Sequence, residues 1–428
     1  MYLLYSFVLA LVALLSLPWW GLQMLRLGKY RAGFAERLGR TPPRLKRDGT
    51  AGCIWIHAVS VGEVLAVSNL VRELERAAPG TPVLVSTTTL TGQQLARERF
   101  GKDHVFFLPL DFGFSVRPYF KLLRPRLLVL AETELWPNLL HMAKRQGAAV
   151  AIVNARISDR SFPRYRRFRR LFTPVLSEVD LFLAQTQEDC TRLLEMGAAA
   201  GRARVSGNLK FDIRPSANSP LVSELRAAIA KDSPVIVCGS TAEGEEELLL
   251  AAFQKVLEQY PKAVMVLAPR HPERFDHVAG LISARNLPLW RRSSWSTHDA
   301  LAGSVFLLDN VGELASIYAV ADVAFVGGSL IPVGGHNILE PAQHGVAVMT
   351  GPHTNNFREI VRIFEKGNAL TVVTADTLAP ELLQLLGDRA RRESLGGRAS
   401  ELFCQHTGAT ARTLEALRPF LPKETAAR

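Results

Sequence analysis

Residues 53–77 have the sequence CIWIHAVSVGEVLAVSNLVRELERA, and this stretch decides the fold class. It begins with a short apolar run that ends at a Ser-Val-Gly turn, and from Glu63 onward its apolar residues recur at helical spacing. A buried strand that turns directly into a helix is the first half of a βαβ unit. Because the helices of such units cover both faces of a sheet, we expect an α/β protein with parallel strands.

The same alternation of apolar run and helical pattern recurs in two series along the chain. The first series contains the runs at residues 82–89, 104–110, 126–132, 148–156 and 181–186. A stretch rich in Ser, Asn and Pro, residues 206–220, follows it. The second series contains the runs at residues 234–240, 262–270, 304–310, 322–329, 346–352 and 369–374. We therefore predict two Rossmann-like doubly wound domains that face a central cleft, with ligands beyond the carboxyl ends of the strands.

The predicted domain boundaries follow these series, and a chain of 428 residues is long enough for two domains. Residues 25–210 form the N-terminal Rossmann-like domain. Residues 211–428 form the C-terminal one, whose last helices are free to cross back to the N-terminal domain. Residues 1–24 precede both domains and form a membrane anchor, for a reason given below.

The composition limits the classes of partner. Hydrophobic residues make up 48% of the chain, which excludes a largely disordered protein. Lys and Arg total 51 against 40 Asp and Glu, so the formal net charge is +11. Such an excess favours nucleic acid, anionic lipid or a phosphorylated substrate as partner. The four cysteines are scattered without a CxxC pair, which indicates reduced, structural thiols.

The N-terminal stretch has no charged residue before Arg26 and consists almost entirely of apolar and aromatic residues. About 20 such residues can cross the hydrocarbon core of a bilayer. No basic segment precedes the stretch and no small-x-small site ends it, so a cleaved signal peptide is the weaker alternative. Trp19 and Trp20 suit the membrane interface, and basic residues follow them. We expect a membrane anchor or a deeply seated interfacial helix, with the bulk of the chain on the cytoplasmic side.

Carboxylates follow two strands of the first series. Glu63 lies in the first turn of its predicted helix, where it complements the helix dipole or acts as a general base that the dipole keeps ionised. Glu132 and Glu134 follow the run at residues 126–132, and one of them caps a helix while the other faces the cleft. Lys210 lies near the interdomain stretch. It is either a cation that contacts a departing phosphate or a solvated lysine of the linker.

Polar clusters also follow five strands of the second series, which is typical of a nucleotide site. Residues 238–247, CGSTAEGEEE, suit a helix capped by Ser240 or Thr241 with acids in its first turn. Arg270 follows the next strand and offers a planar fork for phosphate. The remaining clusters contain Gly312 and Glu313, where the carboxylate suits ribose hydroxyls, then His336, Asn337 and Glu340, and finally His353, Asn355 and Asn356.

The glycine-rich segment GGSLIPVGGHNILEPAQHG, residues 327–345, belongs to this set and leads into a run from Ile338 to Val348 that is expected to be helical. Glycine lets a backbone approach a ligand closely, and a helix N-terminus offers free N–H groups to an anion. Neither a Walker A motif nor a G-x-G-x-x-G after the first strand is present, which disfavours an ATPase or a dehydrogenase. The histidine spacing disfavours a protein-held zinc ion.

The segment RISDRSFPRYRRFRR, residues 156–170, contains seven arginines interleaved with Phe162, Tyr165 and Phe168. A solvated helical face is the ordinary interpretation, and nucleic-acid binding fits only the composition. Arginines between aromatic side chains also suit an anionic membrane surface or the phosphates of a lipid. We favour a contact with the membrane or with a lipid acceptor.

Seven blocks of this sequence, spread over both halves, resemble the signature blocks of the 3-deoxy-D-manno-octulosonic acid (Kdo) transferases of lipopolysaccharide assembly, which are glycosyltransferases of the B fold. The blocks are HAVSVGE, ETELWPN, GNLKFD, GSTAEGEE, APRHPERF, GGSL with GGHNILEPA, and GPHTNNF. The resemblance implies transfer of Kdo from CMP-Kdo to the lipid A precursor, in lipopolysaccharide core biosynthesis at a bacterial inner membrane. It also implies an acceptor-binding N-terminal domain, a CMP-sugar-binding C-terminal domain and no metal or other cofactor.

The resemblance assigns a role to individual residues. It makes Glu63 the general base, and it makes Glu132, less certainly Glu134, and Lys210 groups that support the transition state. It places donor recognition on Pro269, Arg270, Gly312, Glu313, Leu314, Asn337, Ile338, Leu339 and Glu340. Attack opposite the leaving group predicts inversion at the transferred carbon. The partners are then CMP-Kdo, the lipid A precursor and an anionic membrane surface, without nucleic acid.

Two other functions remain open on the sequence. One is a B-fold glycosyltransferase that uses a UDP-sugar on another lipid acceptor. The other is a non-catalytic, membrane-tethered nucleotide-binding protein, against which the carboxylate after the first strand argues. Nucleic-acid binding is the weakest alternative, because only the positive net charge supports it.

Overall fold

The computed structural model describes residues 1–27, 32–46, 52–212, 220–296 and 300–422, with the backbone alone for residues 18–27. The chain forms two compact units. Unit 1 comprises Met1–Ile213 with Thr407–Arg428, and unit 2 comprises Arg214–His406. Both units are α/β, as the alternation of apolar runs and helical patterns predicts. The expected change of domain after residue 210 lies within a few residues of the point where unit 2 begins.

Unit 1 is built on a seven-stranded sheet in the order β3-β2-β1-β4-β5-β6-β7, and every neighbouring pair is parallel. The strands are β1 (Ile54–His57), β2 (Val83–Thr87), β3 (Val105–Phe107), β4 (Leu127–Ala131), β5 (Ala149–Ala155), β6 (Leu181–Ala184) and β7 (Ala203–Val205). Sequence patterns predicted all of these except β7, which is short and only partly apolar.

Side chains of β1 alternate between two hydrophobic cores, one on each face of this sheet. Trp55 packs with Phe106 and Phe120 in one core, whereas Ile54 and Ile56 belong to the other. The helices of unit 1 are α1 (Tyr2–Leu27), α2 (Phe34–Arg37), α3 (Val61–Ala77), α4 (Leu90–Phe100), α5 (Gly113–Leu123), α6 (Pro137–Arg145), α7 (Phe162–Arg167), α8 (Arg169–Leu176), α9 (Gln187–Glu195) and α18 (Ala409–Leu417). Because both faces are covered, polar groups are confined to the strand ends and the loops.

Unit 2 repeats this plan with a second all-parallel sheet, in the order β10-β11-β9-β8-β12-β13-β14. Its strands are β8 (Val235–Thr241), β9 (Val264–Pro269), β10 (Leu289–Arg291), β11 (Val305–Leu307), β12 (Val323–Val326), β13 (Ala347–Thr350) and β14 (Thr371–Val372). Its helices are α10 (Pro220–Ala228), α11 (Glu245–Gln259), α12 (Phe275–Ala284), α13 (Leu314–Ile317), α14 (Leu339–Ala342), α15 (Arg358–Lys366), α16 (Leu378–Gly387) and α17 (Arg389–His406).

One prediction about unit 2 is wrong. The run from Ile338 to Val348 was expected to be helical, yet α14 comprises only Leu339–Ala342. Gly345 has a positive φ of 68°, and β13 begins at Ala347. The end of the expected helix therefore belongs to the strand that the apolar run at residues 346–352 predicts.

Among the residues that the structure describes, no helix is both long and apolar enough to cross a membrane. The structure therefore gives no support to the predicted membrane anchor over residues 1–24. α1 is nevertheless held against unit 1 at its first turns. The Tyr2 hydroxyl donates to Glu178 at 2.8 Å, and Ser6 exchanges hydrogen bonds with the side chain of Asn138 in α6.

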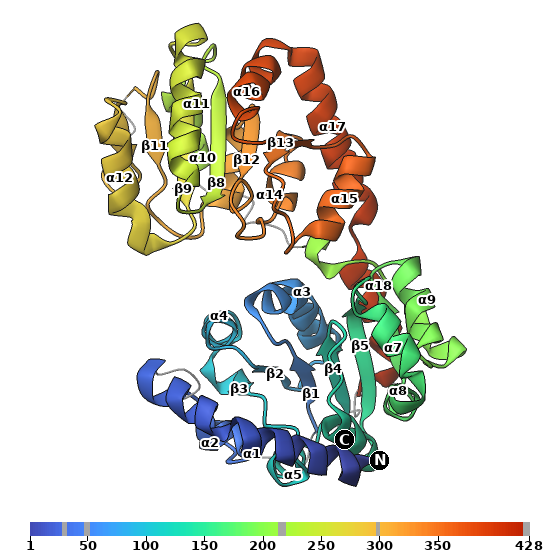
Figure 1. The fold of residues 1–428 in the computed structure, drawn as a ribbon. Coiled ribbons are helices and arrows are strands. Elements are labelled where there is room, and N and C mark those ends of the chain that lie inside the picture. The colour runs from blue at the N-terminus through green and yellow to red at the C-terminus, as the bar shows by residue number, and fades with distance from the viewer. Residues whose placement is uncertain (28–31, 47–51, 213–219, 297–299, 423–428) are drawn as a thin grey trace. The chain divides into compact units, whose positions relative to one another are not determined.

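The chain returns to unit 1 at Thr407 (Figure 1). There α18 contacts α3 and the single helical turn Leu209–Asp212. Asp212 holds the start of α18, because its carboxylate accepts from Gly408 N at 2.7 Å and from Thr410 N at 2.5 Å. A carboxylate at this position satisfies backbone N–H groups that have no partner within the helix.

Asp212→Ala is expected to lower the free energy of unfolding of unit 1 by about 1–2 kcal/mol, the usual cost of losing an N-terminal helix cap. Thermal unfolding measures the loss, and limited proteolysis should cut near residue 407 faster than in wild type. Asp376→Ala, at an exposed position of unit 2, is the matched control. Equal stability of the two variants would show that Asp212 does not hold α18.

Candidate active site

Glu63 lies in the first turn of α3, directly beyond the carboxyl end of β1, as predicted. The residue is 8% exposed, and its carboxylate turns back over the start of the helix. There it accepts from Val59 N at 2.7 Å and from the Ser60 hydroxyl at 2.9 Å. These two donors fix the carboxylate in one orientation, and Ser60 is a site residue that the sequence pattern did not single out.

Burial raises the pKa of Glu63 to about 7, and the charges of Glu132 and Glu134 act in the same direction. The hydrogen bonds from Val59 and Ser60 oppose this shift without cancelling it. The helix dipole was expected to keep Glu63 ionised at neutral pH, but the pKa is raised because loss of water outweighs the local dipoles. A carboxylate with a pKa near 7 is suited to accept and release a proton at physiological pH.

Glu132 and Lys210 form an ion pair close to Glu63. The chain turns sharply at Glu132, which directly follows β4 and has a positive φ of 58°. Its Oε1 lies 3.4 Å from the Nζ of Lys210, and the Lys210 side chain is 18% exposed. Lys210 is therefore a partly buried, paired side chain and not a solvated linker lysine. The structure thus places these three predicted residues of unit 1 within electrostatic reach of one another.

Glu134 lies in the same loop, and burial together with the charge of Glu132 raises its pKa. Both carboxylates line a cavity of about 230 Å³, whose opposite wall comes from the start of the arginine-rich segment. That wall contains Arg156, Ser158 and Tyr165. The sequence suggested a contact for this segment but not its proximity to the carboxylates, which arises because β4 and β5 are neighbours in the sheet.

The rest of the arginine-rich segment forms α7 and α8. Arg164 lies over the ring of Tyr165 and Arg167 over the ring of Phe168, at 5.8 and 5.9 Å from the ring centroids. Phe168 and Leu171 are exposed. The segment therefore presents cations and apolar side chains together, which suits the interface of a lipid more than open water.

In unit 2, Arg270 directly follows β9. Its charge acts to lower the pKa of His336 and that of Glu340, two residues of the glycine-rich segment. Burial lowers the pKa of His336 to about 4, and the charge of Arg270 adds to this shift. Burial raises the pKa of Glu340, which Asn337 opposes by donating a hydrogen bond at 3.3 Å. The structure therefore brings Arg270, Asn337 and Glu340 together.

Glu313 stands at the N-cap position of the short helix α13, and its carboxylate is already paired with other side chains. It accepts from Arg292 Nε at 3.1 Å and from the side chain of Asn310. Gly312, just before it, has a φ of +104°, and a Cβ added there would meet open space. Neither Arg292 nor Asn310 was predicted from the sequence as a site residue. Arg292 directly follows β10, a strand that the sequence patterns did not predict.

The side chains of three predicted donor-binding residues are unavailable to a ligand. Ile338 and Leu339 are at most 2% exposed and belong to the packing of unit 2. Pro269 is the last residue of β9 and is buried. At these positions only the main chain is left to contact a nucleotide.

The glycine-rich loop is organised by a residue whose role the sequence did not reveal. Glu245, the first residue of α11, is fully buried and accepts four backbone N–H groups. Ala242 and Gly328 donate to its Oε2 at 2.9 and 2.6 Å, and Ser329 and Leu330 donate to its Oε1, each at 2.8 Å. The N–H groups of residues 328–330 are therefore satisfied within the protein, and the offer of free N–H groups at the helix start that ends the segment stays a prediction.

Gly327 explains why this loop needs glycine. A Cβ at this position would lie 2.7 Å from the carbonyl oxygen of Ser240 and 2.8 Å from Glu245 Oε2. The first glycine thus allows the loop to approach the β8–α11 turn, not a ligand. The predicted side-chain cap of α11 is also absent, because Gly244 stands at the N-cap and Thr241 donates to Glu246.

No group of three His, Cys, Asp or Glu side chains that could hold a metal ion occurs within the described ranges. The absence of a metal requirement stays a prediction. All four cysteines lie among the described residues, where none forms a disulfide.

Comparison with known proteins identifies the family. A sequence profile described as 3-deoxy-D-manno-octulosonic-acid transferase (kdotransferase) matches residues 32–213. The chain is 36% identical to the 3-deoxy-D-manno-octulosonic acid transferase of Haemophilus influenzae, covering 98% of each chain. It is 38% identical to that of Bordetella pertussis, covering 97% of this chain and 99% of the relative. The chain belongs to the Kdo transferase family.

This enzyme is therefore a glycosyltransferase that acts as a Kdo transferase, which leaves the non-catalytic alternative without support. Its fold also matches a glycosyltransferase structure from Rickettsia africae, with a TM-score of 0.55 at 12% identity, covering 87% of this chain and 99% of that one. A likeness at this identity concerns the fold alone. Together with the two parallel sheets, it assigns this Kdo transferase to the glycosyltransferase B fold.

The raised pKa of Glu63 predicts a pH-dependent cost of folding. Its folded pKa of about 7 lies above its ordinary value of 4.5, so its stabilising contribution is complete below pH 4.5 and is lost as the pH rises through 7. Glu63→Gln removes this dependence. The stability of the variant relative to wild type should rise by about 1.4 kcal/mol per pH unit between pH 5 and 6.5.

Chemical denaturation of both proteins over this pH range measures the difference. Glu75→Gln, an exposed position on the same helix, is the control and should show no such slope. A difference between Glu63→Gln and wild type that does not change with pH would contradict the raised pKa.

Glu245→Gln is expected to destabilise unit 2 by about 1–3 kcal/mol, because the new amide NH₂ would face two of the four N–H donors and leave them unsatisfied. Thermal unfolding and hydrogen exchange at residues 328–330 are the measurements. Glu243→Gln, two residues earlier and exposed, is the control. Unchanged exchange in the loop would show that Glu245 does not hold it.

Proposed function

We propose that this enzyme is an inverting transferase that moves Kdo from CMP-Kdo to the lipid A precursor, lipid IVA, in lipopolysaccharide core biosynthesis. The family supports the transferred sugar, and the resemblance in all seven sequence blocks supports this donor and this acceptor. The observation that carries the mechanism is Glu63, a buried carboxylate held by two hydrogen bonds and with a pKa near 7.

Glu63 acts as the general base. The acceptor hydroxyl gives its proton to the Glu63 carboxylate as its oxygen bonds to the anomeric carbon of Kdo. The bond between that carbon and the phosphate oxygen breaks, and CMP leaves with the electron pair. Val59 N–H and the Ser60 hydroxyl hold the carboxylate in place, so little reorganisation is needed in the transition state.

Glu132 and Lys210 support the transition state. The anomeric carbon develops positive charge as the phosphate departs, and the Glu132 carboxylate stabilises that charge. Lys210 holds Glu132 in place through the ion pair between their side chains. Glu134 is the less favoured candidate for this role, because its pKa is raised and no cation pairs with it among the described residues.

Unit 2 binds the donor. Arg270 binds the phosphate of CMP, since a guanidinium offers two parallel donors to phosphate oxygens. Glu313, fixed by Arg292, accepts from the ribose hydroxyls. The other contacts come from Pro269, Gly312, Leu314, Asn337, Ile338, Leu339 and Glu340, with Ile338 and Leu339 acting through their main chains. We propose that the reaction needs no metal or cofactor.

The acceptor is a lipid, which supports a location at the cytoplasmic side of the bacterial inner membrane. α1 exposes apolar side chains to the surroundings, and α7 and α8 expose arginines beside aromatic rings. The cavity lined by Glu132, Glu134 and Arg156 joins the second of these surfaces to the carboxylates. We propose that the arginine-rich segment binds the acceptor phosphates next to the base.

Glu63→Gln should lower kcat by about 10²–10⁴-fold, the usual contribution of a general base, while CMP binding is retained. In wild type kcat should rise with pH through about 7 as Glu63 loses its proton. The assay measures Kdo addition to lipid IVA in detergent and identifies the lipid product by mass. Glu75→Gln on the same helix is the control and should turn over normally.

Normal turnover by Glu63→Gln would disprove its role as base. A UDP-sugar donor on another lipid is the alternative function, and thermal protection separates the two. CMP should raise the melting temperature more than UMP does, and stronger protection by UMP would contradict the proposed donor.

A further inference from the structure

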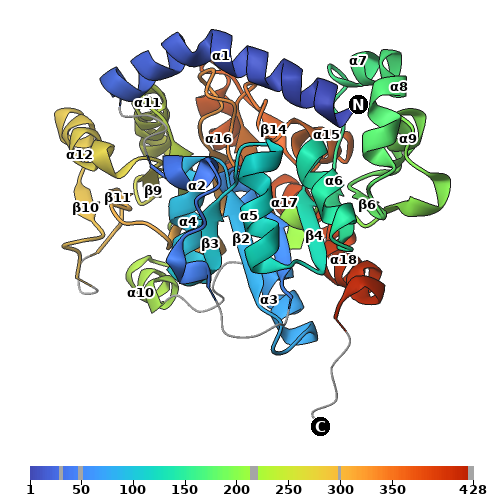
Figure 2. The ribbon, with the colours of Figure 1, turned by 90° about the horizontal axis from the view of Figure 1, so that it is seen from below.

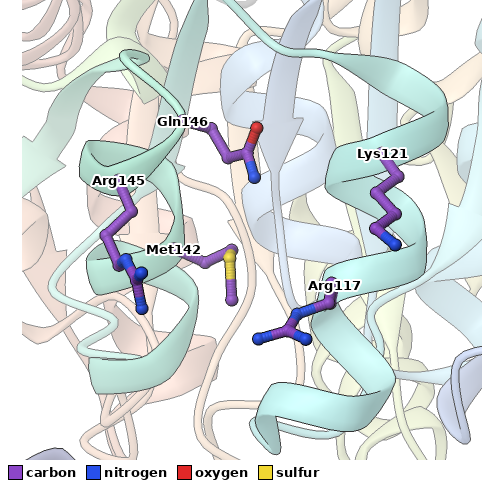
Figure 3. Close-up of a pocket in the computed structure, with 5 residues that line it drawn as sticks. All are labelled: Arg117, Lys121, Met142, Arg145 and Gln146. Atoms are coloured by element: carbon purple, nitrogen blue, oxygen red, sulfur yellow. The ribbon is translucent and has the colours of Figure 1, made fainter.

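A cationic groove runs between α5 and α6 in unit 1. Arg117 and Lys121 on α5 line it from one side, and Met142, Arg145 and Gln146 from α6 and its end line it from the other. Figure 3 shows Arg117, Met142 and Gln146 directed into the space between the two helices, whereas Lys121 and Arg145 extend along their own helices. The cavity measures about 210 Å³. We refer to it as the α5–α6 groove.

The groove continues into a second hollow of about 570 Å³, which shares Lys121 and Gln146 with it. This hollow adds two further cations, Arg124 and Arg126, and is bounded by Gly147. Neither hollow is lined by a carboxylate. Like charges gathered in this way repel one another, and a bound anion would relieve that repulsion.

These cations differ from their neighbours in lacking acidic partners. Lys144, one residue before Arg145, is paired with Asp180 at 2.7 Å. None of the five groove cations forms an ion pair within the ranges that the structure describes. All five are exposed. The groove therefore has the positive charge that a phosphate-bearing ligand requires, whereas the charge of the neighbouring Lys144 is neutralised by Asp180.

The groove is not part of the site that contains Glu63. Arg126 immediately precedes β4, and Gly147 lies just before β5, so the larger hollow is at the amino ends of these strands. Glu63 and Glu132 follow the carboxyl ends of β1 and β4. In a parallel sheet these ends lie on opposite edges, so the groove cannot bind the reacting groups of either substrate.

α1 contacts α6, one of the two helices that line the groove, and lies on the same side of unit 1 as α5 (Figure 2). The ring of Tyr2 stacks on His141, the residue before Met142, with 3.9 Å between ring centroids. Apart from this contact, α1 exposes many apolar side chains. Its exposed large side chains are Leu3, Leu4, Phe7, Val8, Leu11, Val12, Leu14, Leu15 and Leu17.

An apolar helix beside a group of unpaired cations has the two properties that bind a protein to an anionic bilayer. We propose that the α5–α6 groove binds the phosphate of an anionic phospholipid headgroup while α1 lies among the adjacent lipids. Arg117 and Arg145 supply planar forks for the phosphate oxygens, and Met142 packs against the glycerol portion. The inference rests on the proposed membrane location of the enzyme.

The experiment compares binding of the full chain to vesicles of phosphatidylcholine alone and to vesicles that also contain phosphatidylglycerol. The variant carries Arg117→Gln, Lys121→Gln and Arg145→Gln. It should bind the phosphatidylglycerol vesicles at least about tenfold more weakly than wild type, since each cation near an anionic surface contributes roughly fivefold. Its binding to pure phosphatidylcholine, which depends on α1, should not change.

The matched control carries Lys231→Gln, Lys255→Gln and Lys366→Gln, which remove the same charge from exposed positions of unit 2. It should retain wild-type affinity for the anionic vesicles. Equal weakening of both variants, or no weakening of the groove variant, would overturn the proposal. Displacement of wild type from vesicles by millimolar glycerol phosphate would assign the groove to a free anion instead.

Turnover on detergent-dispersed lipid IVA separates this proposal from the proposed function. The groove variant should transfer Kdo at the wild-type rate in detergent, because the groove lies away from Glu63. Loss of that turnover would show that the groove serves the acceptor and would overturn the headgroup assignment. Vesicle binding itself needs no turnover, so it tests the groove even if the donor or acceptor were different.

Discussion

The burial of both parallel sheets on both faces is the constraint from which the rest of this structure follows. Every strand of the two central regions is surrounded by apolar side chains, as the alternation of Trp55 and its neighbours between two cores shows. Polar groups are then left to the strand ends and the loops that follow them. Glu63 after β1, Glu132 after β4 and Arg270 after β9 occupy such positions because no others exist near the sheet.

Two buried carboxylates show how differently a similar position can be used. Glu63 and Glu245 each lie in the first turn of a helix that directly follows a strand. Glu245 accepts four backbone N–H groups and thereby holds a loop. Glu63 accepts only two hydrogen bonds and lies near two other carboxylates, and burial raises its pKa to about 7. The two carboxylates therefore differ in the number of donors that surround them.

The glycines of unit 2 illustrate the same distinction between structure and binding. Gly327 permits close approach of the loop to Ser240 and Glu245, and the N–H groups after it are already used. The neighbouring cluster of Arg270, Asn337 and Glu340 is where we propose that the donor binds. The first glycine of the segment therefore serves the packing of the loop.

The sequence by itself determined the α/β class, most of the strands, the position of Glu63 in the first turn of α3 and the family to which the chain belongs. These depend on local periodicity and on residues close together in the chain. The tertiary structure alone decided the pKa of Glu63, the pairing of Lys210 with Glu132 across 78 residues and three of the four partners of Glu245, which lie 83–85 residues away. It also ended α14 at Ala342. Burial and charge depend on what the fold brings together, and no local pattern carries that information.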